Sequence, residues 1–280
     1  MKFAICNEIF FYEDRDKWPI RRQFEVAAEL GFDGIEISPF TLNDWVQQIT
    51  DEQKAEVVEA SRDTGLPVAG IHWLLIGPTG LHVTAPDPEV RRRTRDYFCD
   101  LVRFGIEIGG GLMVVGSPKQ RAILEGVAPE QAWQWFQEAM TEAGEVGREA
   151  DFKVCIEPLA AATGNNFLHR AEEARRMAEA IGLPNVGVIL DTYSGSQEEP
   201  DLPQAIRDTA PYLFHYHCND INKMAPGYGT VDFVPIMRAL LDINYQRYCS
   251  IEVFDFSLDA VEHCRGGLAA LQRALAEAGG

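Results

Sequence analysis

The sequence predicts an α/β protein folded as a single (β/α)8 TIM barrel over residues 1–280, and two observations support this fold. Short apolar runs alternate with longer amphipathic runs along the whole chain, which is the pattern of repeated βα units around a parallel sheet. Eight of the short runs are predicted strands, at residues 3–6, 34–38, 67–75, 112–117, 153–158, 186–191, 213–219 and 248–254. A chain of 280 residues is long enough for one such barrel.

Helices are predicted between these strands, and several carry recognisable ends. Thr50 and Gln53 form the pattern of an N-terminal capping box, in which each side chain bonds the other's backbone N–H. Gly65 and Gly182 are placed for left-handed C-terminal caps. The glycines at 109–111 follow a long predicted helix and precede a strand, so we interpret them as a helix stop and not as a dinucleotide-binding loop.

Composition excludes several classes of partner. The chain has 43 acidic and 25 basic residues, a net charge of −18, which repels phosphate backbones and predicts no nucleic-acid partner. No apolar stretch is long enough to cross a bilayer, and polar residues follow the start too soon for a signal peptide. The six cysteines form no CxxC pair and are predicted to be buried, reduced thiols. We therefore expect a cytoplasmic protein with no membrane partner.

Four predicted strands end in side chains that can bind a metal. Glu157, Asp191, His217 and Glu252 each close an otherwise apolar run, and active sites of such barrels lie at the carboxyl ends of the strands. Burying three carboxylates together is costly unless a cation neutralises them. The four residues are therefore predicted to bind one divalent metal ion.

One imidazole and three carboxylates make a site dominated by oxygen. Such a site suits Mn²⁺, our first choice, with Mg²⁺, Co²⁺ or Zn²⁺ as alternatives. His215 lies two residues before His217, on the same face of the predicted strand. We expect His215 to support the site and not to bind the ion.

The motifs around these residues are Ile-Glu157-Pro-Leu, Leu-Asp191-Thr-Tyr, His-Tyr-His217-Cys-Asn-Asp220 and Ile-Glu252-Val. Together they resemble the xylose isomerase-like TIM-barrel sugar (phosphate) isomerases and epimerases, the family that includes D-tagatose and D-psicose 3-epimerases. The resemblance implies a metal-dependent isomerase or epimerase of a small ketose or sugar derivative. It further implies a cis-enediolate route in which Glu157 and Glu252 serve as the catalytic acid/base pair.

The resemblance also implies substrate-binding positions, where this chain departs from the epimerase pattern. Ser194 replaces a histidine, Lys223 replaces an arginine, and Thr163 replaces a glutamate, while Asp220 lies among the substrate-contacting positions. Plain hexulose 3-epimerisation is therefore not implied, and the general class is the better prediction.

Two further stretches are candidates for substrate binding on chemical grounds. His72 and Trp73, at the end of the third predicted strand, could offer a hydrogen bond and a stacking wall or simply be core. Ser117, Lys119 and Arg121 follow the fourth strand and could bind a carboxylate or phosphate, or form a solvated helix start.

Other functions remain open from sequence. The same metal and base would serve a lyase, such as a dehydratase of a keto-inositol or dehydroshikimate type. A nuclease like endonuclease IV would need more histidines than the six present, and a binding protein on a decayed barrel would keep ligands without turnover. The expected partner is a small sugar or polyol-derived molecule, and assembly into a homo-oligomer is left open.

Overall fold

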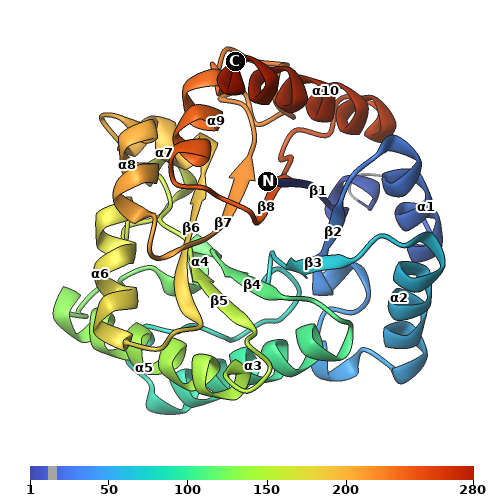
Figure 1. Ribbon diagram of the computed structural model, residues 1–280. Helices are drawn as coiled ribbons and strands as arrows, with labels where there is room; N and C mark the ends of the chain where they lie inside the picture. Colours follow the sequence, from blue (N-terminus) through green and yellow to red (C-terminus); the bar gives the residue numbers. More distant parts are fainter. Residues whose placement is uncertain (12–17) are drawn as a thin grey trace.

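The computed structural model describes residues 1–11 and 18–280, which form a closed barrel of parallel strands in the order β1 to β8 (Figure 1). The strands are β1 Lys2–Cys6, β2 Gly34–Ile37, β3 Val68–Ile71, β4 Leu112–Val115, β5 Lys153–Ile156, β6 Val186–Asp191, β7 Leu213–Cys218 and β8 Tyr248–Ile251. The predicted fold is confirmed. β2, β3, β4, β5, β7 and β8 end one to four residues earlier than predicted, which leaves His72, Glu157 and Glu252 just beyond their strands.

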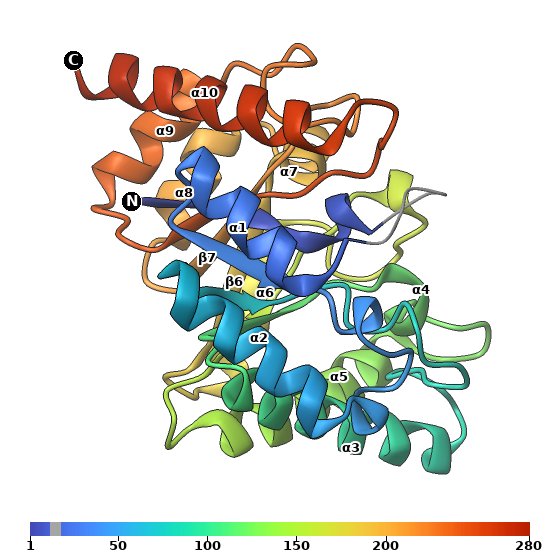
Figure 2. The same ribbon diagram turned by 90° about the vertical axis from the view of Figure 1, so that its right-hand side faces the viewer.

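Helices form a ring outside the strands. They are α1 Ile20–Leu30, α2 Asp51–Thr64, α3 Pro88–Glu107, α5 Pro129–Gly147, α6 Ala171–Ile181, α8 Leu202–Thr209, α9 Phe233–Asp242 and α10 Ala260–Gly279. Short helices α4 Pro118–Arg121 and α7 Thr192–Glu198, and the 3-10 turns η1 Asn7–Phe10, η2 Pro39–Thr41, η3 Val46–Gln48 and η4 Ala161–Thr163, belong to the loops. Figure 2 shows α4 at the end of the barrel opposite the two chain termini.

The predicted helix ends are confirmed. Thr50 and Gln53 form a capping box at the start of α2. Gly65 and Gly182 adopt φ of 71° each as left-handed caps, and Gly109 has φ of 79° where the chain leaves α3. These glycines turn the chain back toward the next strand, because other residues rarely adopt positive φ.

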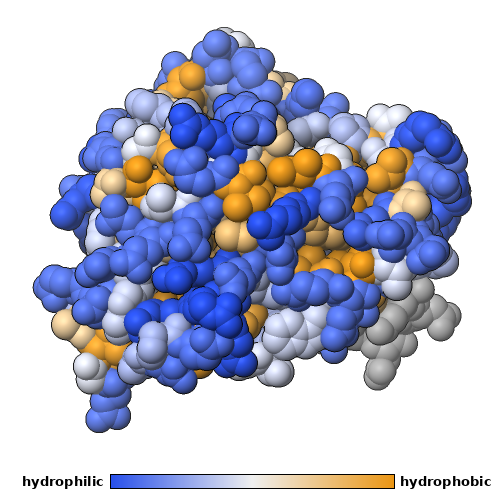
Figure 3. All heavy atoms as spheres, turned by 90° about the horizontal axis from the view of Figure 1, so that it is seen from below, coloured by the Kyte–Doolittle hydropathy of each residue, from blue (hydrophilic) through white to orange (hydrophobic). Residues whose placement is uncertain are grey.

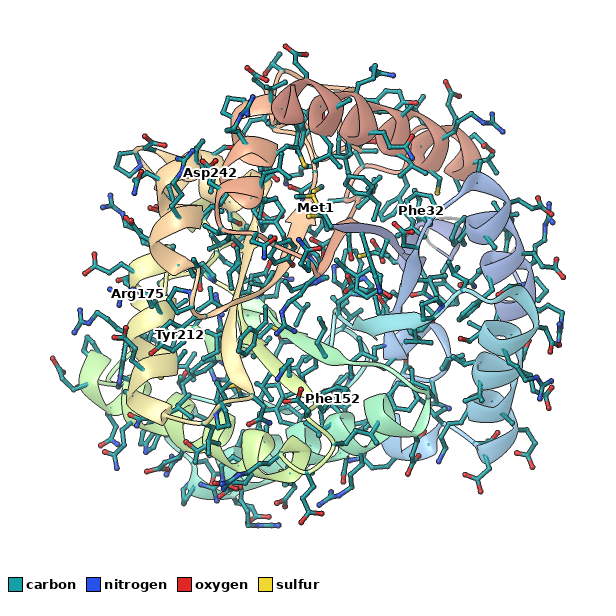
Figure 4. The ribbon with its side chains drawn as sticks, viewed as in Figure 1. Met1, Phe32, Phe152, Arg175, Tyr212 and Asp242 are labelled. Carbon is teal, nitrogen blue, oxygen red and sulfur yellow. The ribbon has the colours of Figure 1, made fainter. Side chains whose placement is uncertain are left out.

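Alternation along the strands divides the side chains between two apolar regions. Tyr216, Cys218 and Phe152 pack in the large core between the strands and the helices. Figure 4 shows Phe152 inside the ring of helices and Arg175 at its outer edge. Leu112, Val114, Cys155 and Ile189 form a separate buried cluster. Because Glu157 and Asp191 follow Cys155 and Ile189 by two residues, they share the same side of β5 and β6.

The outer surface is polar over most of the face that α3 and α5 contribute (Figure 3).

All six cysteines are free and buried, as predicted. Within residues 1–11 and 18–280, no helix combines the length and apolar character that crossing a membrane requires.

Candidate active site

A cavity of about 380 Å³ lies at the carboxyl ends of the strands. Its acidic groups are Glu157, Asp191 and Glu252, which come from three different strand ends. The remaining lining is largely apolar and contains a few polar side chains. Its apolar and aromatic members and glycine are Trp73, Ile76, Val114, Gly116, Pro118, Leu159, Ala162, Tyr193 and Phe254, and its polar members are Ser117, Thr163, Ser194 and Lys223. The cavity therefore combines charged groups with a largely apolar lining.

Of the four predicted metal ligands, Glu157, Asp191 and Glu252 line this cavity, and His217 lies next to them behind the lining. Glu157, His217 and Glu252 each offer a donor atom within 4.8 Å of the others, and all three are buried. The register of β6 and β7 places Asp191 directly beside His217. The Oδ2 atom of Asp191 accepts a hydrogen bond from Asn219 at 2.6 Å, and its Oδ1 accepts the Ser194 backbone N–H at 2.7 Å.

The carboxylates repel one another strongly. Burial, followed by the charges of Glu252 and Asp191, raises the pKa of Glu157 to about 8. Burial and Glu252 likewise raise the pKa of Asp191 to about 6. Arg121 is also buried, and desolvation lowers its pKa to about 10 although Glu157 opposes this change. The excess of buried negative charge, together with a donor set of one imidazole and three carboxylates, fits a hard divalent cation.

Glu252 differs from Glu157 in its surroundings. Its Oε1 accepts a hydrogen bond from Trp73 Nε1 at 2.6 Å, and its Oε2 lies 3.1 Å from His217 Nδ1. Burial would raise the pKa of Glu252, but His217 outweighs it and the pKa falls below the ordinary value. In the metal-free site the pKa values of the two glutamates are therefore shifted in opposite directions, that of Glu157 upward and that of Glu252 downward.

His217 is held between carboxylates on both sides. Its Nε2 lies 3.3 Å from Glu36 Oε2, opposite the nitrogen that faces Glu252. Burial would lower the pKa of His217, but Glu252 and Glu36 raise it well above its usual value. His215 contacts Glu36 at 2.6 Å and, like His217, is not among the residues that line the cavity.

Sequence reasoning gave Glu8 and Glu36 no role. Glu8 bonds His72 Nε2 through Oε2 at 2.6 Å, and Ser38 Oγ lies 3.0 Å from the same nitrogen. His72 is fully buried in this network and does not line the cavity, so the structure does not place it where a substrate contact was predicted. Both glutamates lie at strand ends in the sequence, which is the signal that could have identified them.

The other predicted substrate contacts separate into two groups. Ser117, Ser194 and Lys223 line the cavity, whereas Lys119 does not. Asp220 is buried away from the cavity lining, where its carboxylate accepts backbone N–H groups from the loop that follows β7. The position of Asp220 therefore points to loop organisation and not to substrate contact.

Lys223 adopts φ of 68° and connects the loop after β7 to the loop after β8 by backbone hydrogen bonds. Its carbonyl accepts the N–H groups of Phe254 and Asp255 from the loop after β8, and its Nζ lies 5.4 Å from the centre of the Tyr193 ring. Phe254 in turn stacks on Trp73 with 5.6 Å between ring centres, and Trp73 stacks on Phe40 at 5.9 Å. An aromatic wall thus forms beside Glu252.

Comparison with known proteins identifies the class. The family described as the xylose isomerase-like TIM barrel matches residues 24–275. A D-psicose 3-epimerase of Enterocloster bolteae is 30% identical over 239 residues, which cover 84% of this chain and 76% of the relative. A 3-dehydro-D-guloside 4-epimerase of Escherichia coli is 27% identical over 291 residues, which cover 97% of this chain and 99% of the relative.

A solved structure agrees with these relatives. The apo 3-keto-D-glucoside 4-epimerase of E. coli has 26% sequence identity and a TM-score of 0.81, and the match covers 98% of this chain and 99% of that one. The chain belongs to the xylose isomerase-like TIM-barrel family. It is an enzyme of the isomerase and epimerase class, as the sequence motifs predicted.

Proposed function

We propose that this protein is a divalent-metal-dependent epimerase of a small ketose or keto-sugar derivative, with Glu157 and Glu252 as its acid/base pair. The observation that carries the proposal is the pair of buried glutamates at one cavity, whose donor atoms lie within 4.8 Å of each other and of His217, and whose pKa values are shifted in opposite directions in the metal-free site. Such a pair can donate and accept protons at the same pH.

Glu157, Asp191, His217 and Glu252 would hold the ion, for which Mn²⁺ is our first choice. When bound, a divalent ion would stabilise negative charge on the carbonyl and neighbouring hydroxyl oxygens of the sugar. The proton transfers are carried out by side chains of the protein.

Glu252 is proposed to remove the proton from the carbon next to the sugar carbonyl. The C–H electrons then pass into an enediolate, and the Glu252 carboxylate becomes a carboxylic acid. Glu157 passes a proton taken up from solvent to the other face of that carbon, and the proton on Glu252 returns to solvent, so the configuration inverts and both carboxylates are again ionised. Trp73 donates to Glu252 Oε1 at 2.6 Å and so holds the base in place, while Phe254 and Leu159 help exclude water.

The relatives supply two substrate classes to compare. One is a free ketohexose, as in the name D-psicose 3-epimerase, and the other is a keto-glycoside, as in 3-dehydro-D-guloside 4-epimerase. The aromatic wall of Trp73 and Phe254 suits the apolar face of a sugar ring in either class. We further propose a cytoplasmic location, because the free thiols suit a reducing compartment.

The test is turnover in D₂O with Mn²⁺, followed by proton NMR, using D-psicose, D-tagatose and a methyl 3-keto-D-glucoside. Epimerisation gives a product of inverted configuration with deuterium at the inverted carbon. Loss of water from the product would instead establish the lyase alternative. Glu157→Gln and Glu252→Gln should each lower turnover by about 10²-fold or more, since each removes one proton-transfer group.

A further inference from the structure

Glu36 is a buried carboxylate surrounded by three imidazoles. It lies on β2, fully buried, across the barrel from the β7 residues that it contacts. Its Oε1 is 2.6 Å from His215 Nε2, and its Oε2 is 3.3 Å from His217 Nε2 and 3.7 Å from His72 Nδ1. A buried carboxylate is costly without such partners, so this arrangement keeps Glu36 ionised.

The contact with Glu36 places a proton on the Nε2 atom of His217. An ionised carboxylate can only accept hydrogen bonds, so the nitrogen that faces Glu36 must donate. Among the described residues the other polar contact of His217 Nε2 is the Cys6 thiol, with Sγ at 3.9 Å. His217 Nδ1 faces the opposite way, toward Glu252 Oε2 at 3.1 Å.

His215 prevents Glu36 from turning away. Its bond to Glu36 Oε1 is the shortest of the three contacts, and Ser250 Oγ lies 3.3 Å from the same imidazole nitrogen. With Oε1 held there, Oε2 stays beside His217. The arrangement explains why His215 stands two residues before His217 on the same face of β7 without reaching the cavity.

We infer that Glu36 is a positioning residue: it accepts the Nε2–H of His217 and thereby directs His217 Nδ1 toward Glu252 and the proposed ion. This inference rests on the proposed function, since it concerns one of the proposed ligands. Histidine ligands of metals commonly donate their second N–H to a carboxylate, which fixes the ring and makes it a better ligand.

The chain offers a matched control in Glu8. Like Glu36, Glu8 is fully buried and pairs with a buried histidine at 2.6 Å, but its partner is His72 and not His217. A Glu8→Gln variant therefore removes a comparable buried charge from the same barrel interior and leaves the His217 contacts in place.

The first measurement is nitrogen-15 NMR of histidine-labelled protein, metal-free and with Mg²⁺. In the wild type, His217 Nε2 should carry a proton that exchanges slowly in both states. Glu36→Gln should speed that exchange or shift the Nε2 resonance, and Glu8→Gln should not. The inference is overturned if wild-type Nε2 carries no proton, a result that needs no variant to fold, or if Glu36→Gln changes neither the exchange rate nor the resonance.

The second measurement is a Mn²⁺ titration followed by EPR of the free ion. We expect Glu36→Gln to weaken binding by about 10–100-fold and Glu8→Gln to bind as the wild type does. Equal weakening in both variants would show a general effect of the interior and contradict the inference. If the wild type binds no Mn²⁺, the metal-dependent function fails, while the NMR of metal-free protein still decides the role of Glu36.

Discussion

Gly116, just after β4, has no side chain because the Glu157 carboxylate occupies the space that a Cβ would need. A Cβ there would come well inside van der Waals contact of Glu157 Oε2. Glu157 is both a proposed ligand and a proposed acid, and its carboxylate can keep this position only because residue 116 has no side chain.

Gly116→Ala should therefore displace Glu157 and lower epimerase turnover by about 10²-fold, because a shift of about 1 Å in a catalytic group is enough. Turnover and Mn²⁺ affinity of the variant are the measurements. Gly111→Ala is the control, since a Cβ at Gly111 meets only Ala69 O at an ordinary 3.5 Å. Equal activity of the two variants would contradict this role for Gly116.

The raised pKa of Glu157 also affects stability. An acid whose folded pKa lies near 8, above its unfolded value of 4.5, binds a proton more tightly in the folded state. Its contribution to stability is complete below about pH 4.5 and is lost as the pH rises through about 8.

In metal-free protein, Glu157→Gln should remove this loss, because the amide resembles the protonated acid. We expect the free energy of unfolding of the variant to exceed that of the wild type by on the order of 2–4 kcal/mol at pH 8.5, and to match it near pH 4.5. Urea unfolding at both pH values in EDTA measures the difference. A constant difference at both values would show that ionisation of Glu157 is not its cause.

At the scale of elements, the loop after β7 is organised by one side chain. Asp220 Oδ1 accepts the N–H groups of Thr230 and Val231 at 2.9 and 3.1 Å, and Oδ2 accepts that of Gly227 at 3.2 Å. The same loop contributes Lys223 to the cavity and to the contact with the loop after β8.

Asp220→Ala should leave these backbone groups without an acceptor and loosen residues 221–231. We expect KM for the sugar to rise about tenfold or more, with Mn²⁺ affinity close to that of the wild type, because the four proposed ligands are on other segments. Steady-state kinetics and limited proteolysis are the measurements. Asp232→Ala removes the cap of α9 instead, costs about 1 kcal/mol of stability, and should leave KM unchanged.

The contrast between Asp191 and Asp220 explains what sequence could predict. Asp191 ends an apolar strand, and the βα rhythm together with the period of two places it beside His217 without further information. Besides the adjacent Ile221 N–H, the partners of Asp220 are backbone N–H groups seven to eleven residues away, which have no sequence signature. Glu36 and His72 lie at strand ends, which a sequence can show, but their contacts with one another and with His217 depend on the register of β2, β3 and β7 around the closed barrel, which no local sequence pattern encodes.

At the scale of the whole molecule, the proposed ligands all come from one half of the barrel. Glu157, Asp191, His217 and Glu252 come from the ends of β5, β6, β7 and β8, four consecutive strands, and the rest of the barrel supports them through Glu36 and Trp73. An ion held by all four would bind the folded chain and not the unfolded one. Its binding free energy would then add to the stability of the entire barrel.

Mn²⁺ at about 100 times its Kd should stabilise the protein by about 2.7 kcal/mol, which corresponds to a rise in Tm on the order of 5 °C. At one fixed Mn²⁺ concentration the rise should be larger at pH 8 than at pH 6, because Glu157 and Asp191, with metal-free pKa values of about 8 and about 6, must lose protons before they bind a cation. Differential scanning calorimetry at both pH values, with and without Mn²⁺, gives the measurement. Asp191→Asn should abolish most of the rise, whereas Asp232→Asn, which alters an acid outside the cavity lining, should retain it. A rise that both variants share equally would place the ion elsewhere on this acidic chain.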